Sequence, residues 1–233
     1  GTRLVELLTE KEKTYEAVLR LGVSTDTQDM TGTILSEKPV TVTEEEVRET
    51  VASFVGEQMQ VPPMYSALKV NGKKLCDLAR AGVTVERQAR PVQIYSIEII
   101  KMELPRVCMR VRCSKGTYIR TLCQDIGEKL SCGACMESLL RTKVSEFCVQ
   151  DALRLSEIEE RVQKAAGQTP SEQWNAEMFD FIYAVDSVFL QYKKAVICKE
   201  WNKLLYNGNR MKKDMFVSYQ KDWEQQKVRI YDE

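Results

Sequence analysis

Apolar and polar residues alternate over residues 107–113, and leucine or isoleucine then recurs at every fourth position over residues 122–130. The alternation predicts a strand with one buried face, and the four-residue spacing predicts a helix with one apolar stripe. Between them, Ser114-Lys115-Gly116 is typical of a tight turn, because glycine adopts positive φ without strain. Arg120 therefore lies where a strand and turn lead into a helix, which is a rigid place from which to present a charge.

Two further segments, residues 13–21 and 92–102, alternate in the same way. In the first, Tyr15 and Ala17 share one face of the predicted strand. The second is joined to the 107–113 strand by the short connection Leu104-Pro105, so we expect these two strands to pair antiparallel.

Helical patterns occur on either side of these strands. Thr43 and Glu46 predict a capping box that opens a helix, with Gly56 expected to end it. The other expected elements are a short helix carrying Met136, Leu139 and Leu140, a strand at 144–149, and a helix with a capping box at Ser156 and Glu159 that ends near Gly167.

Residues 61–74 carry three lysines and no acidic residue, and they include one aromatic residue, Tyr65. The pair Pro62-Pro63 forbids a helix at its start, and Asn71-Gly72 predicts a hairpin turn. A short helix is expected at 75–81, ending at Gly82. We expect this segment to be mobile and to become ordered on a partner.

The pattern changes again near the end of the chain. Residues 168–172 are polar and contain a proline, which is typical of a loop or linker. Strands are expected at 188–198, 215–219 and 223–231, which together indicate a small and incomplete β-rich domain.

Composition excludes several classes of protein. The chain has 233 residues, 43% of them hydrophobic, which is enough for one large domain with a small appendage. It has no apolar run of about eighteen residues, so no membrane-spanning helix is expected. The eight cysteines lack the spacing of a disulfide framework, so we expect reduced thiols in the cytoplasm.

Histidine is absent, which removes the most frequent general base and metal ligand. The chemistry must then come from carboxylates, tyrosines, lysines or cysteines. Cys132 and Cys135 have the spacing of a metal or redox pair, but no second such pair accompanies them, so a structural role is favoured.

The formal net charge is zero, yet the charges are unevenly distributed. Six basic residues and two acidic ones lie between positions 69 and 90, and five basic residues without any acid lie between 106 and 120. Each cluster alone is more typical of a solvated face. Together they are also compatible with binding to a phosphate backbone.

Two small groups of residues are candidates for chemistry. Tyr118 and Arg120 are two residues apart, and in an extended segment they would present a phenol and a guanidinium on one face, which suits a flat ring and an anion. A surface arginine beside a half-buried tyrosine is the simpler interpretation. Asp26 and Asp29 resemble a carboxylate pair, although aspartates in a loop rich in threonine and glycine more often cap the backbone.

Four segments together resemble the bacterial TruB-type tRNA pseudouridine-55 synthases. They are KTYEAVLRLGVSTDTQDMTG, VPPMYSALKVNGKKL followed by ARAG, ERQARPVQIY, and RCSKGTYIRTLCQDIGEKL followed by CGA. Their order and spacing agree over roughly residues 1–186. Residues 187–233 resemble a partial RNA-binding domain of the PUA type.

The resemblance implies a reaction and a partner. The implied reaction isomerises uridine 55 in the T-arm of tRNA, by flipping the base and by the action of an aspartate, without cofactor or metal. The implied protein is a cytoplasmic monomer whose partner is the T-arm stem-loop, with no membrane.

The resemblance also implies roles for individual residues. Arg120 would pair with the catalytic carboxylate, Tyr15 would stack on the uracil, Tyr118 would be a second tyrosine of the pocket, and Leu139 would pack under the base. Residues 64–82, called the clamp segment below, match the loop that holds the T-arm. The RNA-binding residues implied are Tyr65, Ser66, Lys69, Lys73, Lys74, Arg80, Arg90, Lys115 and Arg141.

This sequence departs from the family's pattern in several places. The family's catalytic aspartate lies in a motif upstream of the stretch that matches Gly1, so we expect the nucleophile to be absent from these residues and this polypeptide alone to be inactive. Cys76 replaces an aromatic residue of the clamp segment, Leu140 replaces an arginine that precedes Arg141, and Cys135 replaces a residue that is not catalytic.

The predicted fold is an α/β domain over residues 1–186, with a mixed and largely antiparallel sheet flanked by helices, followed by a partial β domain over residues 187–233. The first functional hypothesis is a tRNA pseudouridine synthase. The alternatives are a non-catalytic tRNA-binding protein with the same fold, and a cytosolic metal or redox protein built on Cys132 and Cys135.

Overall fold

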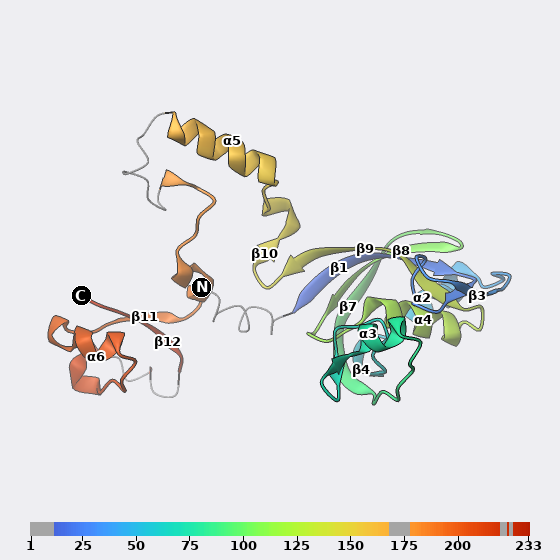
Figure 1. Ribbon diagram of the computed structural model, residues 1–233, viewed down its shortest axis with the longest axis horizontal. Coiled ribbons are helices and arrows are strands. Elements are labelled where there is room, and N and C mark those ends of the chain that lie inside the picture. The colour runs from blue at the N-terminus through green and yellow to red at the C-terminus, as the bar shows by residue number, and fades with distance from the viewer. Residues whose placement is uncertain (1–11, 168–177, 220–222, 224–225) are drawn as a thin grey trace. The chain divides into compact units, whose positions relative to one another are not determined.

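The structure is a computed structural model that describes residues 12–167, 178–219, 223 and 226–233 (Figure 1). The chain forms two compact units, residues 1–152 and 153–233. The predicted boundary between residues 186 and 187 lies inside the second unit. The assignment of a catalytic domain and a PUA-like domain on either side of it remains a prediction.

The first unit is built on a six-stranded sheet with the order β10-β9-β1-β8-β7-β4. Every pairing in this sheet is antiparallel. Its strands are β1 (Lys13–Leu21), β4 (Gly56–Gln60), β7 (Arg90–Glu103), β8 (Arg106–Cys113), β9 (Ala134–Val144) and β10 (Phe147–Cys148). The three strands expected from alternation are thus confirmed, as is the antiparallel pairing of β7 with β8.

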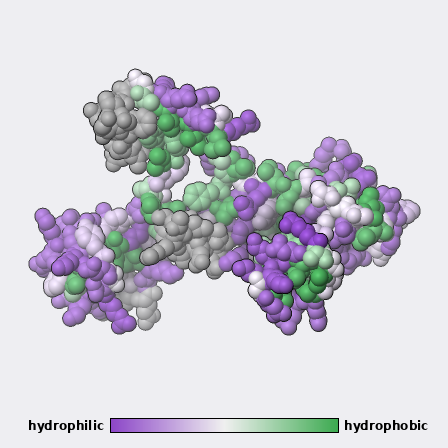
Figure 2. Space-filling model, viewed as in Figure 1, coloured by the Kyte–Doolittle hydropathy of each residue, from purple (hydrophilic) through white to green (hydrophobic). Residues whose placement is uncertain are grey.

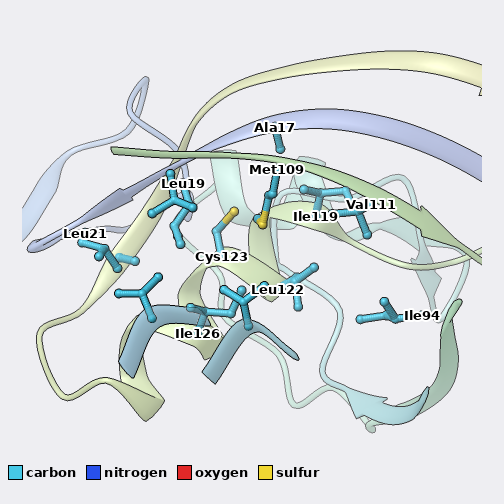
Figure 3. Close-up of a cluster of buried hydrophobic side chains, with 14 of the residues drawn as sticks. Ala17, Leu19, Leu21, Ile94, Met109, Val111, Ile119, Leu122, Cys123 and Ile126 are labelled. Atoms are coloured by element: carbon cyan, nitrogen blue, oxygen red, sulfur yellow. The ribbon is translucent and has the colours of Figure 1, made fainter. Parts of the chain in front are cut away.

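The core lies between the sheet and helix α4 (Ile119–Lys129). Val107, Met109 and Val111 on β8 are fully buried, as their alternation predicted. Leu122 and Ile126 on α4 are also buried, which confirms the apolar stripe of the helix. Figure 3 shows Met109 and Val111 of β8 directed toward Leu122 and Ile126 of α4. This packing fixes α4, and with it Arg120, against the sheet.

Helix α2 (Glu44–Ala52) begins with the predicted capping box. The Thr43 N–H donates to Glu46 Oε2 at 2.7 Å, and the Glu46 N–H donates to Thr43 Oγ1 at 3.3 Å. The predicted end of the helix was wrong, because α2 ends at Ala52 and Gly56, with φ of 116°, begins strand β4 instead.

The clamp segment folds largely as its sequence predicted. Strands β5 (Lys69–Val70) and β6 (Lys73–Lys74) form a hairpin around Asn71 and Gly72, whose φ values of 51° and 80° are those of a two-residue turn with both central residues left-handed. Helix α3 (Leu75–Arg80) follows and ends before Gly82, which has a φ of 72°.

The short helix expected around Met136, Leu139 and Leu140 was wrong. These residues belong to β9, which pairs with β1 from Ala134 to Val144. Periodicity alone does not separate a short apolar strand from a helical turn. Here the free edge of β1 provides backbone partners over the whole length of β9, and this decides in favour of a strand.

The turn-rich loop expected at residues 22–32 contains a short strand. Strand β2 (Val23–Thr25) pairs antiparallel with β3 (Ile34–Glu37), and the turn between them carries Asp26 and Asp29. This hairpin is separate from the large sheet, but its turn contacts β9 through a bridge between Asp29 and Met136.

The second unit is mostly irregular in the residues that the structure describes. Its helix α5 (Leu155–Ala166) confirms the predicted helix. The capping box predicted at Ser156 and Glu159 was wrong, because the helix begins earlier, where the Arg154 N–H donates to Glu157 Oε2 at 2.6 Å. Strand β11 (Lys193–Val196) pairs parallel with β12 (Val228–Tyr231). Its other helical elements are α6 (Asn202–Tyr206) and 3-10 turns at Val185–Phe189, Lys199–Trp201 and Lys213–Met215. A further 3-10 turn, Val149–Asp151, lies at the end of the first unit.

The strand expected at 215–219 was wrong, since only Phe216 makes an isolated bridge there, to Ile197. Over the residues that the structure describes, no helix has the length and apolar character needed to cross a membrane.

Candidate active site

Arg120 is the second residue of α4, and its guanidinium reaches back to the β2–β3 turn. Its Nη1 lies 3.1 Å from Asp29 Oδ2 and also donates to the Thr27 carbonyl at 3.4 Å. Both side chains are largely buried, with 26% of Arg120 and 14% of Asp29 exposed. Arg120 therefore pairs with a carboxylate of this chain, Asp29. The carboxylate expected from the resemblance was a different one, the family's catalytic aspartate.

Asp29 is held on both of its oxygens. Its Oδ1 accepts hydrogen bonds from Thr27 Oγ1 at 3.1 Å, from the Thr31 N–H at 3.0 Å, and from Thr31 Oγ1. Burial opposes ionisation of Asp29, but the bonds from Thr31 and Thr27 and the charge of Arg120 outweigh it and lower the pKa of this carboxyl. Asp29 is therefore an oriented carboxylate.

Asp26 has the simpler role that its sequence context favoured. Its Oδ1 accepts the Thr33 N–H at 2.7 Å, which closes the turn. The backbone-capping interpretation thus holds for both aspartates. Of the two aspartates, only Asp29 also forms an ion pair with an arginine, through its Oδ2. The neighbouring Thr27 and Thr31 were the feature of the sequence that could have indicated its fixed orientation, because both donate hydrogen bonds to its Oδ1.

The turn that carries Asp29 is positioned by β9 and α4. The Met136 N–H donates to the Gln28 carbonyl at 3.0 Å, and the Met30 N–H donates to the Met136 carbonyl at 2.9 Å. Thr121 Oγ1, one residue after Arg120, donates to Gln28 Oε1 at 2.9 Å. The arginine and its carboxylate are consequently held by a shared framework as well as by their own ion pair.

Arg120 also contacts the clamp segment. Its Nη2 donates to the Tyr65 carbonyl at 2.8 Å. One guanidinium thus joins α4, the β2–β3 turn and the start of the clamp segment. A further anchor was not anticipated from the sequence: the buried amide of Gln60 on β4 donates to the Tyr118 carbonyl and accepts the Tyr118 N–H. Tyr118 is the N-cap residue of α4, so Gln60 positions the start of that helix.

Tyr15, Leu139 and Arg141 share one face where β1 meets β9. Tyr15 pairs with Arg141 and Ala17 with Leu139, and opposite residues of antiparallel strands point to the same face. Tyr15 packs against the core, and burial raises the pKa of its phenol while Arg141 lowers it. Leu139 is 44% exposed, so it offers an apolar surface to a ligand.

The predicted RNA-binding residues differ in accessibility. Ser66 is buried, and its hydroxyl has no hydrogen-bond partner among the described residues. Tyr65 is half-buried. Those that are exposed are Lys69, Lys73, Lys74, Arg80, Arg90, Lys115 and Arg141, with Arg80 lying 3.8 Å from Asp77. Their assignment to RNA binding remains a prediction.

The basic cluster at residues 106–120 is largely neutralised by the fold. Arg110 contacts both Glu16 and Glu98 at 2.8 Å, across the neighbouring strands β1 and β7. Arg106 pairs with Glu137, and Arg112 pairs with Glu12. Only charges within residues 106–120 entered the prediction of a basic cluster, so it missed these glutamates, which lie on other segments and are brought close by strand pairing. These three arginines do not form a surface of uncompensated charge.

Cys132 and Cys135 are buried free thiols. Cys135 Sγ lies 3.3 Å from Met30 Sδ, and burial raises the pKa of this thiol to about 11. Over the part of the chain that is described, no group of three or more acidic or cysteine side chains is placed to hold a metal ion. A buried thiol of high pKa is a poor nucleophile and ligand, which disfavours the metal or redox hypothesis.

Comparison with known proteins yields consistent matches along the chain. A model of the TruB family of pseudouridylate synthases (N-terminal domain) matches residues 1–119, and one of the tRNA pseudouridylate synthase B C-terminal domain matches residues 120–190. The tRNA pseudouridine synthase B of Clostridium novyi (strain NT) is 43% identical over 211 residues, covering 91% of this chain and 68% of the relative. That of Lachnoclostridium phytofermentans is 48% identical over 247 residues, covering 100% of this chain and 75% of the relative.

Solved structures confirm the predicted fold class. This chain matches a structure described as a Cbf5-Nop10-Gar1 complex, with a TM-score of 0.66 and 22% identity over 93% of this chain and 54% of the other. A second, described as an H/ACA RNP bound to a substrate RNA containing 2'-deoxyuridine, gives a TM-score of 0.62 and 21% identity over 92% of this chain and 53% of the other. The chain thus spans about half the length of these structural neighbours. From the family matches and the relatives above 40% identity, we conclude that the chain belongs to the TruB family of pseudouridylate synthases.

Proposed function

We propose that this protein isomerises uridine 55 in the T-arm of tRNA to pseudouridine. The proposal is supported by its relatives, which are named tRNA pseudouridine synthase B. In this reaction the bond from N1 of the uracil to the ribose breaks, and a bond from C5 to the same ribose carbon forms. N1 gains a proton and C5 loses one, so the reaction needs no oxidant or reductant.

The observation that carries the proposal is the ion pair of Arg120 with Asp29. It places an oriented carboxylate and a guanidinium at the junction of α4, the β2–β3 turn and the clamp segment. Tyr118 lies two residues from Arg120, and an aromatic ring provides a stacking surface for a flipped base. Tyr15 and Leu139 provide further aromatic and apolar surface on the neighbouring strands.

Within this proposal, Asp29 holds Arg120 and is not the reacting carboxylate. Both of its oxygens already accept hydrogen bonds, and its pKa is lowered, so it is a stable anion fixed in one orientation. Arg120 has five N–H donors, and the three contacts described use Nη1 and Nη2, which leaves donors for a second carboxylate. We assign the nucleophile to an aspartate outside these 233 residues, as the sequence resemblance implies.

The exposed lysines of the β5–β6 hairpin are proposed to hold the RNA backbone. Lys69, Lys73 and Lys74 lie on one short hairpin beside the site and present three positive charges to solvent. A phosphate backbone is the partner that matches such a surface. Monomeric behaviour and a place in the cytoplasm belong to the same proposal.

Release of tritium from C5 of uridine tests the reaction directly, because C5 must lose its hydrogen. The substrate is T-arm stem-loop RNA labelled at C5, and the enzyme is this polypeptide. We expect RNA binding without tritium release, and release when the complete enzyme with its catalytic aspartate is used. A complete enzyme that binds the RNA without releasing tritium would instead indicate a non-catalytic tRNA-binding protein.

The same assay tests the role assigned to Asp29. Release by this polypeptide would show that one of its own carboxylates reacts. Asp29→Asn and Asp26→Asn would then identify which, with Asp26→Asn as the matched control because Asp26 caps the same turn without contacting Arg120.

A further inference from the structure

One residue of the β2–β3 turn has a backbone conformation that its side chain does not favour. Gln28 has a φ of 64°, in the left-handed region. Residues other than glycine, asparagine and aspartate rarely adopt this conformation, because their Cβ is crowded by the backbone. Such a conformation persists only where the surrounding structure imposes it. Here it lies one residue before Asp29, so the contacts of Gln28 bear directly on the candidate active site.

The left-handed residue directs two successive carbonyl groups to different partners. The Thr27 carbonyl accepts a hydrogen bond from Arg120 Nη1 at 3.4 Å, whereas the Gln28 carbonyl accepts the Met136 N–H at 3.0 Å. The first donor belongs to α4 and the second to β9. The change of chain direction at Gln28 is therefore what connects the turn to both elements.

The side chain of Gln28 holds this conformation against α4. Thr121 Oγ1 donates to Gln28 Oε1 at 2.9 Å, and Thr121 is 4% exposed, so water competes little for the bond. Thr121 directly follows Arg120 on the helix. Two consecutive residues of α4 thus bind two consecutive residues of the turn, since Arg120 binds Asp29 and Thr121 binds Gln28.

Apolar packing fixes only one strand of this hairpin within the described residues. Strand β2 is buried at Val23 and Thr25, but β3 is exposed over its whole length, Ile34–Glu37. Figure 2 shows hydrophobic residues at the surface in the region that Figure 1 labels β3. The position of the turn between the two strands therefore depends on its hydrogen bonds to α4 and β9.

We propose that Gln28 is a positioning residue, which fixes Asp29 against Arg120 through its left-handed backbone and its hydrogen bond from Thr121. In this role Gln28 acts through the Asp29 carboxylate and not on the substrate itself. The inference rests on the proposed function only for its consequence on turnover. The effect on Asp29 can be measured without RNA.

The first measurement is the proton affinity of the Asp29 carboxylate in this polypeptide, followed by NMR titration of its carboxyl carbon. Gln28→Ala keeps a Cβ, and so keeps the strain, but removes the bond from Thr121. The hydrogen bonds that lower the pKa of Asp29 depend on its orientation, so this variant should raise the proton affinity about threefold or more. Thr121→Val should have the same effect, and Thr121→Ser, which keeps the hydroxyl, should keep the natural value.

Thr142→Val is the matched control for the loss of a threonine hydroxyl. Thr142 Oγ1 donates to the Thr14 carbonyl at 3.3 Å, near the end of β9 that is farther along the chain from Met136. This variant should leave the proton affinity of Asp29 unchanged. An equal rise in Thr142→Val would show that the effect is not specific to the turn.

Gln28→Gly separates positioning from a merely structural role. Glycine adopts a positive φ without strain, so this variant should melt at a higher temperature than Gln28→Ala. It also lacks the bond from Thr121 and leaves the turn freer, so Asp29 should bind protons at least as strongly as in Gln28→Ala. If Gln28 only stabilised the turn, the more stable variant would instead keep the natural proton affinity.

Under the proposed function, Gln28→Ala should lower kcat for tritium release about tenfold and leave KM within about twofold, because it disturbs the Arg120–Asp29 pair and not the lysines of the β5–β6 hairpin. An unchanged kcat would overturn the role of Gln28 in the reaction. Unchanged proton affinity of Asp29 in both Gln28→Ala and Thr121→Val would overturn the inference and leave the proposed function intact. If the complete enzyme without substitutions released no tritium, the proposed function would fail, and the titration would still decide whether Gln28 positions Asp29.

Discussion

Gln60 binds the peptide groups of Tyr118 with both ends of its side-chain amide. Its Oε1 accepts the Tyr118 N–H at 2.8 Å, and its Nε2 donates to the Tyr118 carbonyl at 3.0 Å. Gln60 is 4% exposed, so water competes little for these bonds. The end of β4 thereby sets the position of the first turn of α4, on which Arg120 is carried.

Replacement of Gln60 should therefore destabilise the fold and disturb the site together. Gln60→Leu leaves a partly buried N–H and carbonyl of Tyr118 without partners, which costs about 1–3 kcal/mol in the free energy of unfolding. Gln58→Leu is the matched control, because Gln58 lies two residues earlier on β4 and makes one longer bond, to the Phe54 carbonyl at 3.2 Å. Urea unfolding measures both. Equal losses in the two variants would contradict the anchoring role of Gln60.

The coupling between Asp29 and Arg120 should exceed that of an exposed ion pair. A double-mutant cycle of Asp29→Asn and Arg120→Met is expected to give a coupling energy of about 1–3 kcal/mol in unfolding experiments, because the pair is partly buried and hydrogen-bonded. The exposed pair of Glu44 and Arg48, 3.5 Å apart on α2, serves as the control and should give about 0.3–0.5 kcal/mol.

Under the proposed function, Arg120→Ala should abolish turnover while leaving RNA affinity within about tenfold, because its described contacts are a carboxylate and backbone carbonyls. Tritium release and filter binding measure the two effects. A parallel loss of both would indicate that Arg120 contacts the RNA.

The lowered pKa of Asp29 predicts how stability depends on pH. The carboxyl binds a proton less readily in the folded state than in the unfolded state, whose pKa is about 3.9. Its stabilising contribution is then complete above that value and is lost as the pH falls through the lower folded pKa. We expect the stability difference between the natural protein and Asp29→Asn to shrink on acidification below about pH 4. If the stability difference instead grows on acidification, the pKa of Asp29 is raised in the folded protein and the prediction is wrong.

Reversal of charge on the β5–β6 hairpin should change the salt dependence of RNA binding. Lys73→Glu with Lys74→Glu should weaken binding and reduce the slope of log K against log salt by about 1–2, as expected for two lost phosphate contacts. Lys101→Glu is the control, because Lys101 on β7 already pairs with Glu103 at 2.8 Å. The assignment of this hairpin to RNA fails if the double variant keeps the natural slope.

Gly127 on α4 should not tolerate alanine. Alanine would favour the helix by about 1 kcal/mol, but a Cβ here would lie 2.2 Å from the Ala134 backbone nitrogen. Because that nitrogen belongs to β9 and cannot move freely, the clash should dominate and lower the melting temperature. Thermal unfolding followed by circular dichroism measures it, and a rise in melting temperature would show that α4 and β9 can separate.

The sequence alone determined most of the local structure. Alternation in residues 107–113, the four-residue stripe from Leu122, the capping box at Thr43 and the turn at Asn71-Gly72 all specify a conformation through neighbours a few residues away. The same reasoning failed for β9, because the edge of β1, distant in sequence, decided between a short helix and a strand.

The tertiary structure alone decided which charges meet. Asp29 and Arg120 are 91 residues apart, and no local pattern joins them. Strand order placed β8 between β1 and β7, so Arg110 became neutralised by Glu16 and Glu98, whereas Arg90 remained without such a partner among the described residues. Hydrophobic periodicity records which face of an element is buried. It does not record which element covers that face, and the electrostatics of the site depend on that second fact.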